Sequence, residues 1–207
     1  MGPDSVRFPT PPRALCWCVA LLVLAWLAGP FAETGVERRM FDGSLGQSGL
    51  TRTPLVWIGR LTEPLVVVGI ALLTVAAAFR TLDRALPLSL PILATLAATF
   101  VLKIAVARPR PLLGLDESGA SWPSGHAAVA MALALSFTML ARRERWPHRS
   151  VLELLALLAA TAVGLARLAM GVHWPTDVLA GWLVAASCVA AYWWAHDRLN
   201  PRFEPAP

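Results

Sequence analysis

A histidine and an aspartate four residues apart, His173 and Asp177, have a spacing that suits nucleophilic chemistry. Pro175 fits the first position of a helix, which makes Trp174 its N-cap and Asp177 its third residue. From there the carboxylate can turn back toward His173, hold one imidazole nitrogen protonated and leave the other free as a nucleophile. The same segment is also an ordinary capped helix start, so the pattern alone leaves both interpretations open. Arg167 lies six residues before His173, at the end of an apolar run.

A second histidine, His126, closes a Pro-Ser-Gly-His tetrapeptide that begins at Pro123 and precedes another apolar run. Proline and serine before a helix are ordinary start signals, so one interpretation is an N-cap at Ser124 with a histidine in the first turn. The other interpretation is an anion site, because a helix N-terminus presents free backbone N–H groups and a partial positive charge. Gly125 would let an anion approach the backbone closely.

The third cluster is basic and contains Lys103 and Arg110. Seven residues separate them, which is two helical turns and predicts one helical face, although Pro109 and Pro111 must end the helix nearby. Cations at the end of a membrane span commonly extend to the headgroups, and this is the structural interpretation of the cluster. Arg108, between them, either helps to bind a ligand or faces the headgroups.

The elements that must position these residues belong to a membrane protein. Of the 207 residues, 57% are hydrophobic and 15% are charged, whereas a soluble domain has about 25% charged residues. This composition excludes a water-soluble globule. The formal charge of +5 comes almost wholly from arginines in short runs between apolar stretches, which is the pattern of membrane topology and excludes a nucleic-acid partner. The cysteines, Cys16, Cys18 and Cys188, have no metal-ligand spacing.

Six apolar stretches are long enough to cross a bilayer, so we expect an all-α, polytopic integral membrane bundle of six transmembrane helices that forms one domain over residues 1–207. The stretches are Ala14–Phe31, Glu63–Phe79, Pro87–Val106, Ser124–Ala141, Ser150–Met170 and Thr176–Ala195. The first could be misread as a secretory signal. It is long for one and lacks a clean small-x-small cleavage site, so we expect an uncleaved helix.

Arginines in short loops predict the orientation, because such loops stay in the cytoplasm. They lie between the fourth and fifth stretches, after the second and in the tail: Arg142, Arg143, Arg145, Arg149, Arg80, Arg84, Arg198 and Arg202. Both termini are then cytoplasmic, and the three clusters face the opposite side, where this rule leaves few cations. Charges gathered at helix ends facing one space indicate function. His148 and His196 fall on the cytoplasmic side, and Glu153 has no assigned role.

In chain order the clusters read Lys-x6-Arg-Pro, Pro-Ser-Gly-His and Arg-x5-His-x3-Asp. This ordered set, from Lys103 to Asp177, closely resembles the type-2 phosphatidic acid phosphatase family, the membrane branch of a superfamily that includes vanadium-dependent haloperoxidases. The six-helix layout extends the resemblance over nearly the whole chain. The family usually has serine before the arginine of its third motif, whereas this chain has Ala166, so one hydroxyl contact to phosphate is expected to be missing.

The resemblance implies a phosphatase that needs no metal and no cofactor. His173 would attack phosphorus to form a phosphohistidine, Asp177 would orient it, and His126 would protonate the leaving oxygen and then activate water. The phosphate-binding groups would be the side chains of Lys103, Arg110 and Arg167 and the backbone N–H groups of Ser124, Gly125 and His126. These cations would take the place that magnesium holds in other phosphatases.

A pocket where the spans meet the outer headgroups suits a substrate with a phosphate at the interface and a tail in the bilayer. Polyprenyl diphosphate, phosphatidate, phosphatidylglycerol phosphate and prenyl-linked sugar phosphates all have this form, and the sequence does not rank them. The excess of arginine over lysine favours a bacterial chain in the plasma (inner) membrane. Protein partners and oligomeric state stay open.

Two other functions also stay open. A lipid phosphotransferase would use the same site but pass the phosphoryl group to another lipid or sugar. A transporter or anion channel normally has its charges at the bilayer midplane, between broken helices or repeats. Here the charges gather at one set of helix ends and no internal repeat is visible, so this function is disfavoured. A haloperoxidase is disfavoured too, because those relatives are soluble.

Overall fold

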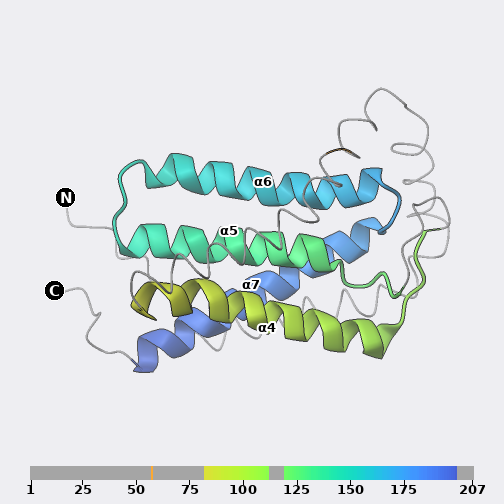
Figure 1. Cartoon of the computed structure of the whole chain (residues 1–207), viewed down its shortest axis with the longest axis horizontal. Helices are drawn as coiled ribbons and strands as arrows, with labels where there is room; N and C mark the ends of the chain where they lie inside the picture. The colour runs from red at the N-terminus through yellow and green to blue at the C-terminus, as the bar shows by residue number, and fades with distance from the viewer. Residues whose placement is uncertain (1–56, 58–81, 112–118, 200–207) are drawn as a thin grey trace.

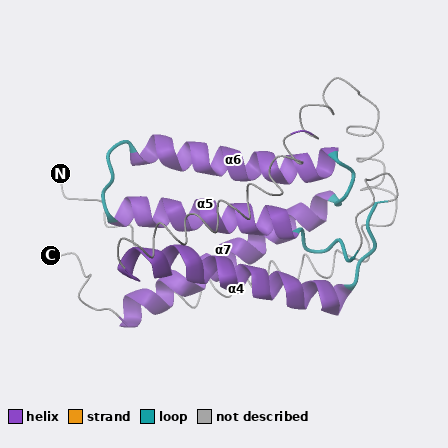
Figure 2. Ribbon diagram, in the orientation of Figure 1, coloured by secondary structure: helices purple, strands orange, loops and turns teal. Residues whose placement is uncertain are grey.

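The computed structural model describes residues 82–111 and 119–199, together with Trp57. They form the long helices α4 (Leu82–Val106), α5 (Gly125–Arg143), α6 (Arg149–Ala169) and α7 (Pro175–Leu199), which run side by side (Figures 1 and 2). Each is long and apolar enough to cross a membrane. The described part is therefore an all-α membrane bundle with four candidate spans. The stretches predicted at 14–31 and 63–79 lie outside the described residues.

The helix boundaries agree with the predicted stretches except at two ends. Helix α4 begins at Leu82 rather than Pro87, and α7 runs to Leu199 rather than Ala195. In both places the helix continues through a charged turn, and charged residues are not counted in a membrane span predicted from hydropathy. Hydropathy predicts only the part of a helix that lies in lipid, whereas the backbone hydrogen bonds of the helix extend past that part.

Helix α5 lies at the centre of the described bundle and contacts each of the other three helices. Its buried residues are mostly alanines: Ala127, Ala128, Ala130, Ala132, Ala134 and Ala141. Small residues let membrane helices approach closely, which is how such helices gain packing energy in lipid. Gly181 of α7 shows how close this approach is, since a Cβ at that position would lie 2.6 Å from the carbonyl oxygen of Ser124. The first turn of α5 is thereby held against α7.

The outward faces of the helices are apolar. Leu93, Phe100 and Ile104 of α4 and Leu154 and Leu158 of α6 are exposed within the described part. Large apolar side chains on the outside of a bundle suit contact with lipid chains. The charged side chains of the four helices lie toward the two ends of the bundle.

Four helix ends meet at one end of the bundle, namely the C-termini of α4 and α6 and the N-termini of α5 and α7 (Figure 1). Helix α4 ends at Val106 because Ala107 has a left-handed backbone, with φ of 47°, and prolines follow. Helix α6 ends before Gly171, whose φ of 71° glycine adopts without strain. The connections at this end carry the residues that the sequence analysis singled out.

Candidate active site

His173 and Asp177 lie together at the start of α7, with the geometry that their spacing predicts. Helix α7 begins at Pro175. Asp177 Oδ2 accepts a hydrogen bond from the Trp174 backbone N–H at 2.8 Å and lies 3.4 Å from His173 Nδ1. Both side chains are buried, with His173 1% and Asp177 0% exposed. The same oxygen, Asp177 Oδ2, therefore caps the start of the helix and faces His173.

The other ring nitrogen of His173 faces Arg110. Nη1 of Arg110 lies 3.3 Å from His173 Nε2 and donates to the Val172 carbonyl oxygen at 2.9 Å. A guanidinium can only donate hydrogen bonds, so Nε2 is the unprotonated nitrogen and the proton is on Nδ1, toward Asp177. This tautomer leaves a lone pair on Nε2, which is what a nucleophilic imidazole needs.

Burial favours the neutral form of His173. Desolvation has the largest effect on the pKa of His173 and lowers it from the ordinary value of 6.5. The Asp177 carboxylate opposes this shift, whereas the positive charges of Arg110 and Arg167 lower the pKa further. The neutral imidazole is consequently the favoured form of His173 at neutral pH.

Asp177 has a second partner, Arg108, whose role the sequence left undecided. Arg108 Nη1 donates to Asp177 Oδ1 at 2.8 Å and to Thr176 Oγ1 at 2.7 Å. The two charged side chains are 3% and 0% exposed, and the guanidinium lies 5.4 Å from the centre of the Trp174 ring. Arg108 therefore turns inward to the carboxylate and not outward to headgroups.

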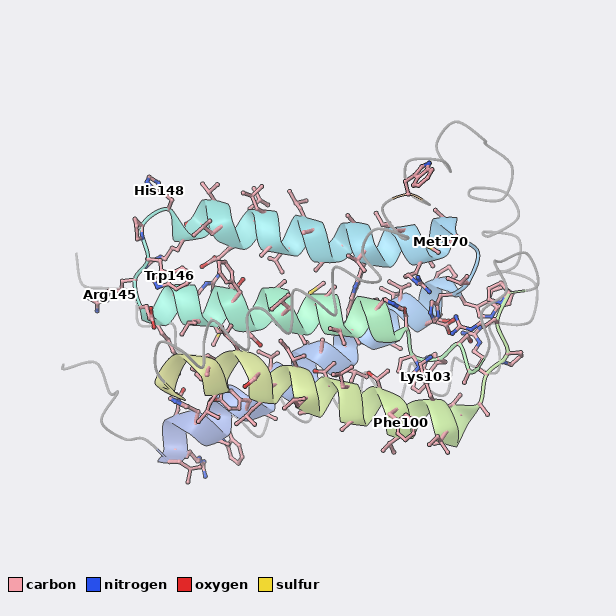
Figure 3. The ribbon with its side chains drawn as sticks, viewed as in Figure 1. Phe100, Lys103, Arg145, Trp146, His148 and Met170 are labelled. Carbon is pink, nitrogen blue, oxygen red and sulfur yellow. The ribbon has the colours of Figure 1, made fainter. Side chains whose placement is uncertain are left out.

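Lys103 and Arg110 do not share a helical face, contrary to the prediction from their spacing, because α4 ends at Val106 and Arg110 lies in the connection that follows. Both nevertheless donate hydrogen bonds to the same segment, residues 119–120. Lys103 Nζ donates to the Ala120 carbonyl oxygen at 2.5 Å, and Arg110 Nε donates to that of Gly119 at 3.2 Å. Figure 3 shows Lys103 near the end of α4 that adjoins the start of α7.

The start of α5 is joined directly to the start of α7. The Ser124 backbone N–H donates to the Asp177 carbonyl oxygen at 2.9 Å, a partner that the sequence analysis did not predict, and its binding to phosphate stays a prediction. Ser124 Oγ, by contrast, is buried, does not cap the helix and makes no hydrogen bond within the described part of the chain. Gly125 and His126 are half-buried in the first turn, where helix N–H groups have no intrahelical acceptor.

Arg167 lies in the last turn of α6 and is 0% exposed. Its Nη1 is 3.8 Å from Met170 Sδ, and its charge acts on His173. Ala166, at the position where the resembling family usually has serine, is also 0% exposed. A hydroxyl at this position would consequently be enclosed by protein.

The opposite end of the bundle holds the residues to which no catalytic role was given. His148 is the N-cap of α6 (Figure 3). His196 lies in the last turn of α7. Glu153 accepts two hydrogen bonds from Arg142, each of 2.8 Å. Within residues 82–111 and 119–199, no group of three His, Cys, Asp or Glu side chains gathers in a way that could hold a metal ion.

Comparison with solved structures gives the fold. A crystal structure described as the first transmembrane PAP2 type phosphatidylglycerolphosphate phosphatase from Bacillus subtilis aligns with a TM-score of 0.76 and 21% identity, over 92% of this chain and 99% of that chain. The crystal structure of Aquifex aeolicus LpxE aligns with a TM-score of 0.56 and 22% identity, over 74% of this chain and 90% of that chain. The chain has the transmembrane fold of these proteins.

Comparison of sequences gives the family and its relatives. The sequence model of the PAP2 superfamily matches residues 84–201. Phosphatidylglycerophosphatase B of Escherichia coli (strain K12) is 38% identical over 92 residues, 44% of this chain and 35% of that protein. Undecaprenyl-diphosphatase of Sulfolobus acidocaldarius is 33% identical over 78 residues, 38% of this chain and 34% of that protein. The chain spans about a third of the length of these curated relatives.

Proposed function

Because the chain belongs to the PAP2 superfamily, we propose that it is an integral membrane phosphatase that hydrolyses a lipid phosphate or diphosphate through a phosphohistidine intermediate. The observation that carries this proposal is the state of His173, whose Nε2 lies 3.3 Å from Arg110 while its Nδ1 faces the Asp177 carboxylate. An imidazole held in this way directs its lone pair to a place where a cation can hold phosphate.

In the first step, His173 Nε2 attacks phosphorus and forms a P–N bond as the P–O bond to the lipid breaks. Positive charge develops on the imidazole, and Asp177 stabilises it through Nδ1–H. His126 donates its proton to the leaving oxygen, so the lipid departs as a neutral alcohol, or as a lipid phosphate when the substrate is a diphosphate.

In the second step, water attacks the phosphohistidine. His126, now neutral, takes a proton from this water, and the P–N bond breaks toward His173. Inorganic phosphate leaves, and both histidines return to their initial protonation states. No step requires a redox partner or any co-substrate other than water.

The equatorial oxygens of phosphorus need positive charge throughout both steps. Lys103, Arg110 and Arg167 supply it from the end of α4, the connection after it and the end of α6. The N–H groups of Gly125 and His126 add the dipole of the α5 N-terminus. Ser124 contributes its buried hydroxyl rather than its N–H, which the Asp177 carbonyl already occupies.

We place the site on the extracytoplasmic side of the plasma (inner) membrane of a bacterium, in a single six-span domain over residues 1–207 with cytoplasmic termini. The support is the arginine-rich connection between α5 and α6, which lies at the opposite end of the bundle from the start of α7 (Figure 1). The substrate is a lipid whose phosphate lies at the interface and whose tail lies in the bilayer. The names of the two sequence relatives favour phosphatidylglycerol phosphate and polyprenyl diphosphate as the first substrates to test.

The test is release of inorganic phosphate by the purified full chain in detergent, from a panel of lipid monophosphates and diphosphates in the presence of EDTA. We expect release by the wild-type protein and its loss in His173→Ala. His148→Ala is the matched control, because it removes a histidine at the opposite end of the bundle.

Retention of full activity by folded His173→Ala protein would refute the mechanism. A requirement for added Mg²⁺ would point to a different catalyst. Transfer of the phosphoryl group to a second lipid, without free phosphate, would make the protein a phosphotransferase instead.

A further inference from the structure

Arg108 is a buried cation at the site, and the proposed mechanism assigns it no role. It comes from the connection after α4 and is 4% exposed, and its guanidinium donates at 2.8 Å to Asp177 Oδ1, the carboxylate oxygen that does not face His173. We propose that Arg108 is a positioning residue, which fixes the Asp177 carboxylate and through it the reactive orientation of His173. This inference rests on the proposed function.

The two oxygens of Asp177 have separate partners. Oδ2 accepts the Trp174 N–H at 2.8 Å and lies 3.4 Å from His173 Nδ1, whereas Oδ1 accepts from Arg108. A carboxylate held at one oxygen can still rotate about its Cβ–Cγ bond, because that torsion is soft. Arg108 holds the second oxygen and so fixes the plane of the carboxylate that His173 meets.

The connection that carries Arg108 is itself fixed. The Arg108 carbonyl oxygen accepts the Ser121 N–H at 2.8 Å. The next carbonyl oxygen, of Pro109, accepts Ser121 Oγ–H at 3.0 Å and the indole N–H of Trp174 at 3.1 Å. The guanidinium also donates to Thr176 Oγ1 at 2.7 Å. Arg108 is therefore held toward α7 by its backbone and its side chain, which favours a role through Asp177 over direct phosphate binding.

The first measurement is the rate of phosphoenzyme formation by full-length Arg108→Gln in detergent, with nitrophenyl phosphate as substrate. A misplaced reactive group costs on the order of 100-fold in rate. We expect a loss of this size in the limiting rate with little change in KM, and partial recovery in Arg108→Lys. A phosphate-binding role would instead raise KM.

The second measurement is the pH dependence of the same reaction. His173 is faced by Asp177 from α7, Arg110 from the connection after α4 and Arg167 from α6, and α5 contributes His126 to the proposed site. Removing the cation on Oδ1 leaves the Asp177 charge free to act on the imidazole, so protonated His173 becomes more favourable. The acidic limb of the pH profile should therefore move to higher pH in Arg108→Gln, a shift that a loss of folding alone would not cause.

A double-mutant comparison separates a positioning role of Arg108 through Asp177 from direct binding of phosphate by Arg108. It remains usable if Arg108→Gln alone fails to fold. Asp177→Asn is compared with Arg108→Gln/Asp177→Asn, in which both members of the buried pair are neutral. Equal rates support action through Asp177. A further loss of tenfold or more in the double variant would overturn the inference.

Arg142→Gln is the matched control, because Arg142 also makes a 2.8 Å pair with a carboxylate, Glu153, but away from the site. It should leave rate, KM and pH profile unchanged. Failure of the proposed function can be told apart from failure of this inference, because full turnover by folded His173→Ala would refute the proposed mechanism. Normal behaviour of Arg108→Gln together with an inactive His173→Ala would overturn this inference alone.

Discussion

At the residue scale, the chemistry depends on which nitrogen of His173 carries the proton. Arg110 fixes Nε2 as the acceptor and Asp177 faces Nδ1, so one tautomer satisfies both neighbours. Arg110 comes from the connection after α4 and Asp177 from the first turn of α7, so the two neighbours approach the imidazole ring from separate segments.

The proposed role of His126 as proton donor leads to a prediction about leaving groups. An alkyl lipid alkoxide leaves poorly and needs a proton, whereas nitrophenolate leaves without help. His126→Gln should therefore slow phosphoenzyme formation from an alkyl lipid phosphate by about 10²–10⁴-fold and affect nitrophenyl phosphate far less. Measuring the first step alone keeps the later activation of water out of the comparison.

His148→Gln serves as the control for this experiment, since that residue caps α6 at the other end of the bundle. Equal losses of rate on the two substrates in His126→Gln would show that His126 only binds phosphate.

The burial of His173 leads to a prediction about its ionisation. Its pKa is lowered, chiefly by desolvation, so the neutral nucleophile should persist as the pH falls through 6.5 and be lost only at lower pH. NMR titration of ¹³C-labelled histidine in detergent can measure this, because the chain has only 4 histidines and His173→Gln assigns the signal. A midpoint at or above 6.5 would contradict the inferred desolvation.

At the element scale, the position of the α5 N-terminus depends on a close contact with α7. Gly181 provides the space, since a Cβ there would meet the Ser124 carbonyl oxygen at 2.6 Å and the Ala128 nitrogen at 3.1 Å. Both atoms belong to the backbone, which cannot turn aside as a side chain can. A larger residue at 181 must therefore move the first turn of α5, and His126 with it.

Gly181→Ala should lower the stability of the protein by about 1–3 kcal/mol through overpacking and also reduce turnover per folded molecule. Gly164→Ala is a matched control, because its Cβ would meet side-chain atoms of Trp182 at 2.7 Å and Val178 at 2.8 Å rather than the α5 backbone. Thermal unfolding in detergent and phosphate release, measured on both variants, test this. Normal turnover in folded Gly181→Ala protein would show that the contact does not position the site.

The sequence predicted what depends on neighbouring residues and missed what depends on distant ones. The start of α7 and the return of Asp177 toward His173 follow from proline and a carboxylate within one turn, so local rules were enough. The partner of Arg108 lies 69 positions along the chain, and no local pattern indicates it. The use of the Ser124 N–H by the Asp177 carbonyl was missed for the same reason.

At the scale of the whole molecule, the two ends of the bundle are joined in different ways. The end away from His173 is tied by side-chain ion pairs, Arg142 with Glu153 between α5 and α6 and Arg143 with Asp197 between α5 and α7. The site end is tied by the connections themselves, through backbone carbonyls and buried charges. The site groups consequently lie at one end of the bundle.

The proposed orientation predicts opposite labelling of two serine positions. In a background without Cys16, Cys18 and Cys188, Ser118→Cys lies next to the exposed Gly119 in sequence, and Ser150→Cys is exposed at the start of α6. An impermeant thiol reagent added to intact cells should label the cysteine at 118 and spare the one at 150. Permeabilised cells, in which both should react, give the control. The reverse pattern would put the site in the cytoplasm.

The hydrogen bond between the Ser124 N–H and the Asp177 carbonyl has a consequence for biosynthesis. A ribosome makes Lys103, Arg110 and the start of α5 well before it makes α7, yet Asp177, which faces His173 and accepts the Ser124 N–H, belongs to that last described span. Until Asp177 has been made and has folded into the first turn of α7, His173 lacks its carboxylate partner and the start of α5 lacks its hydrogen bond to α7. We therefore expect the proposed activity to be absent until α7 is in place, and a chain that terminates before residue 173 to be an inactive membrane protein rather than a weak phosphatase.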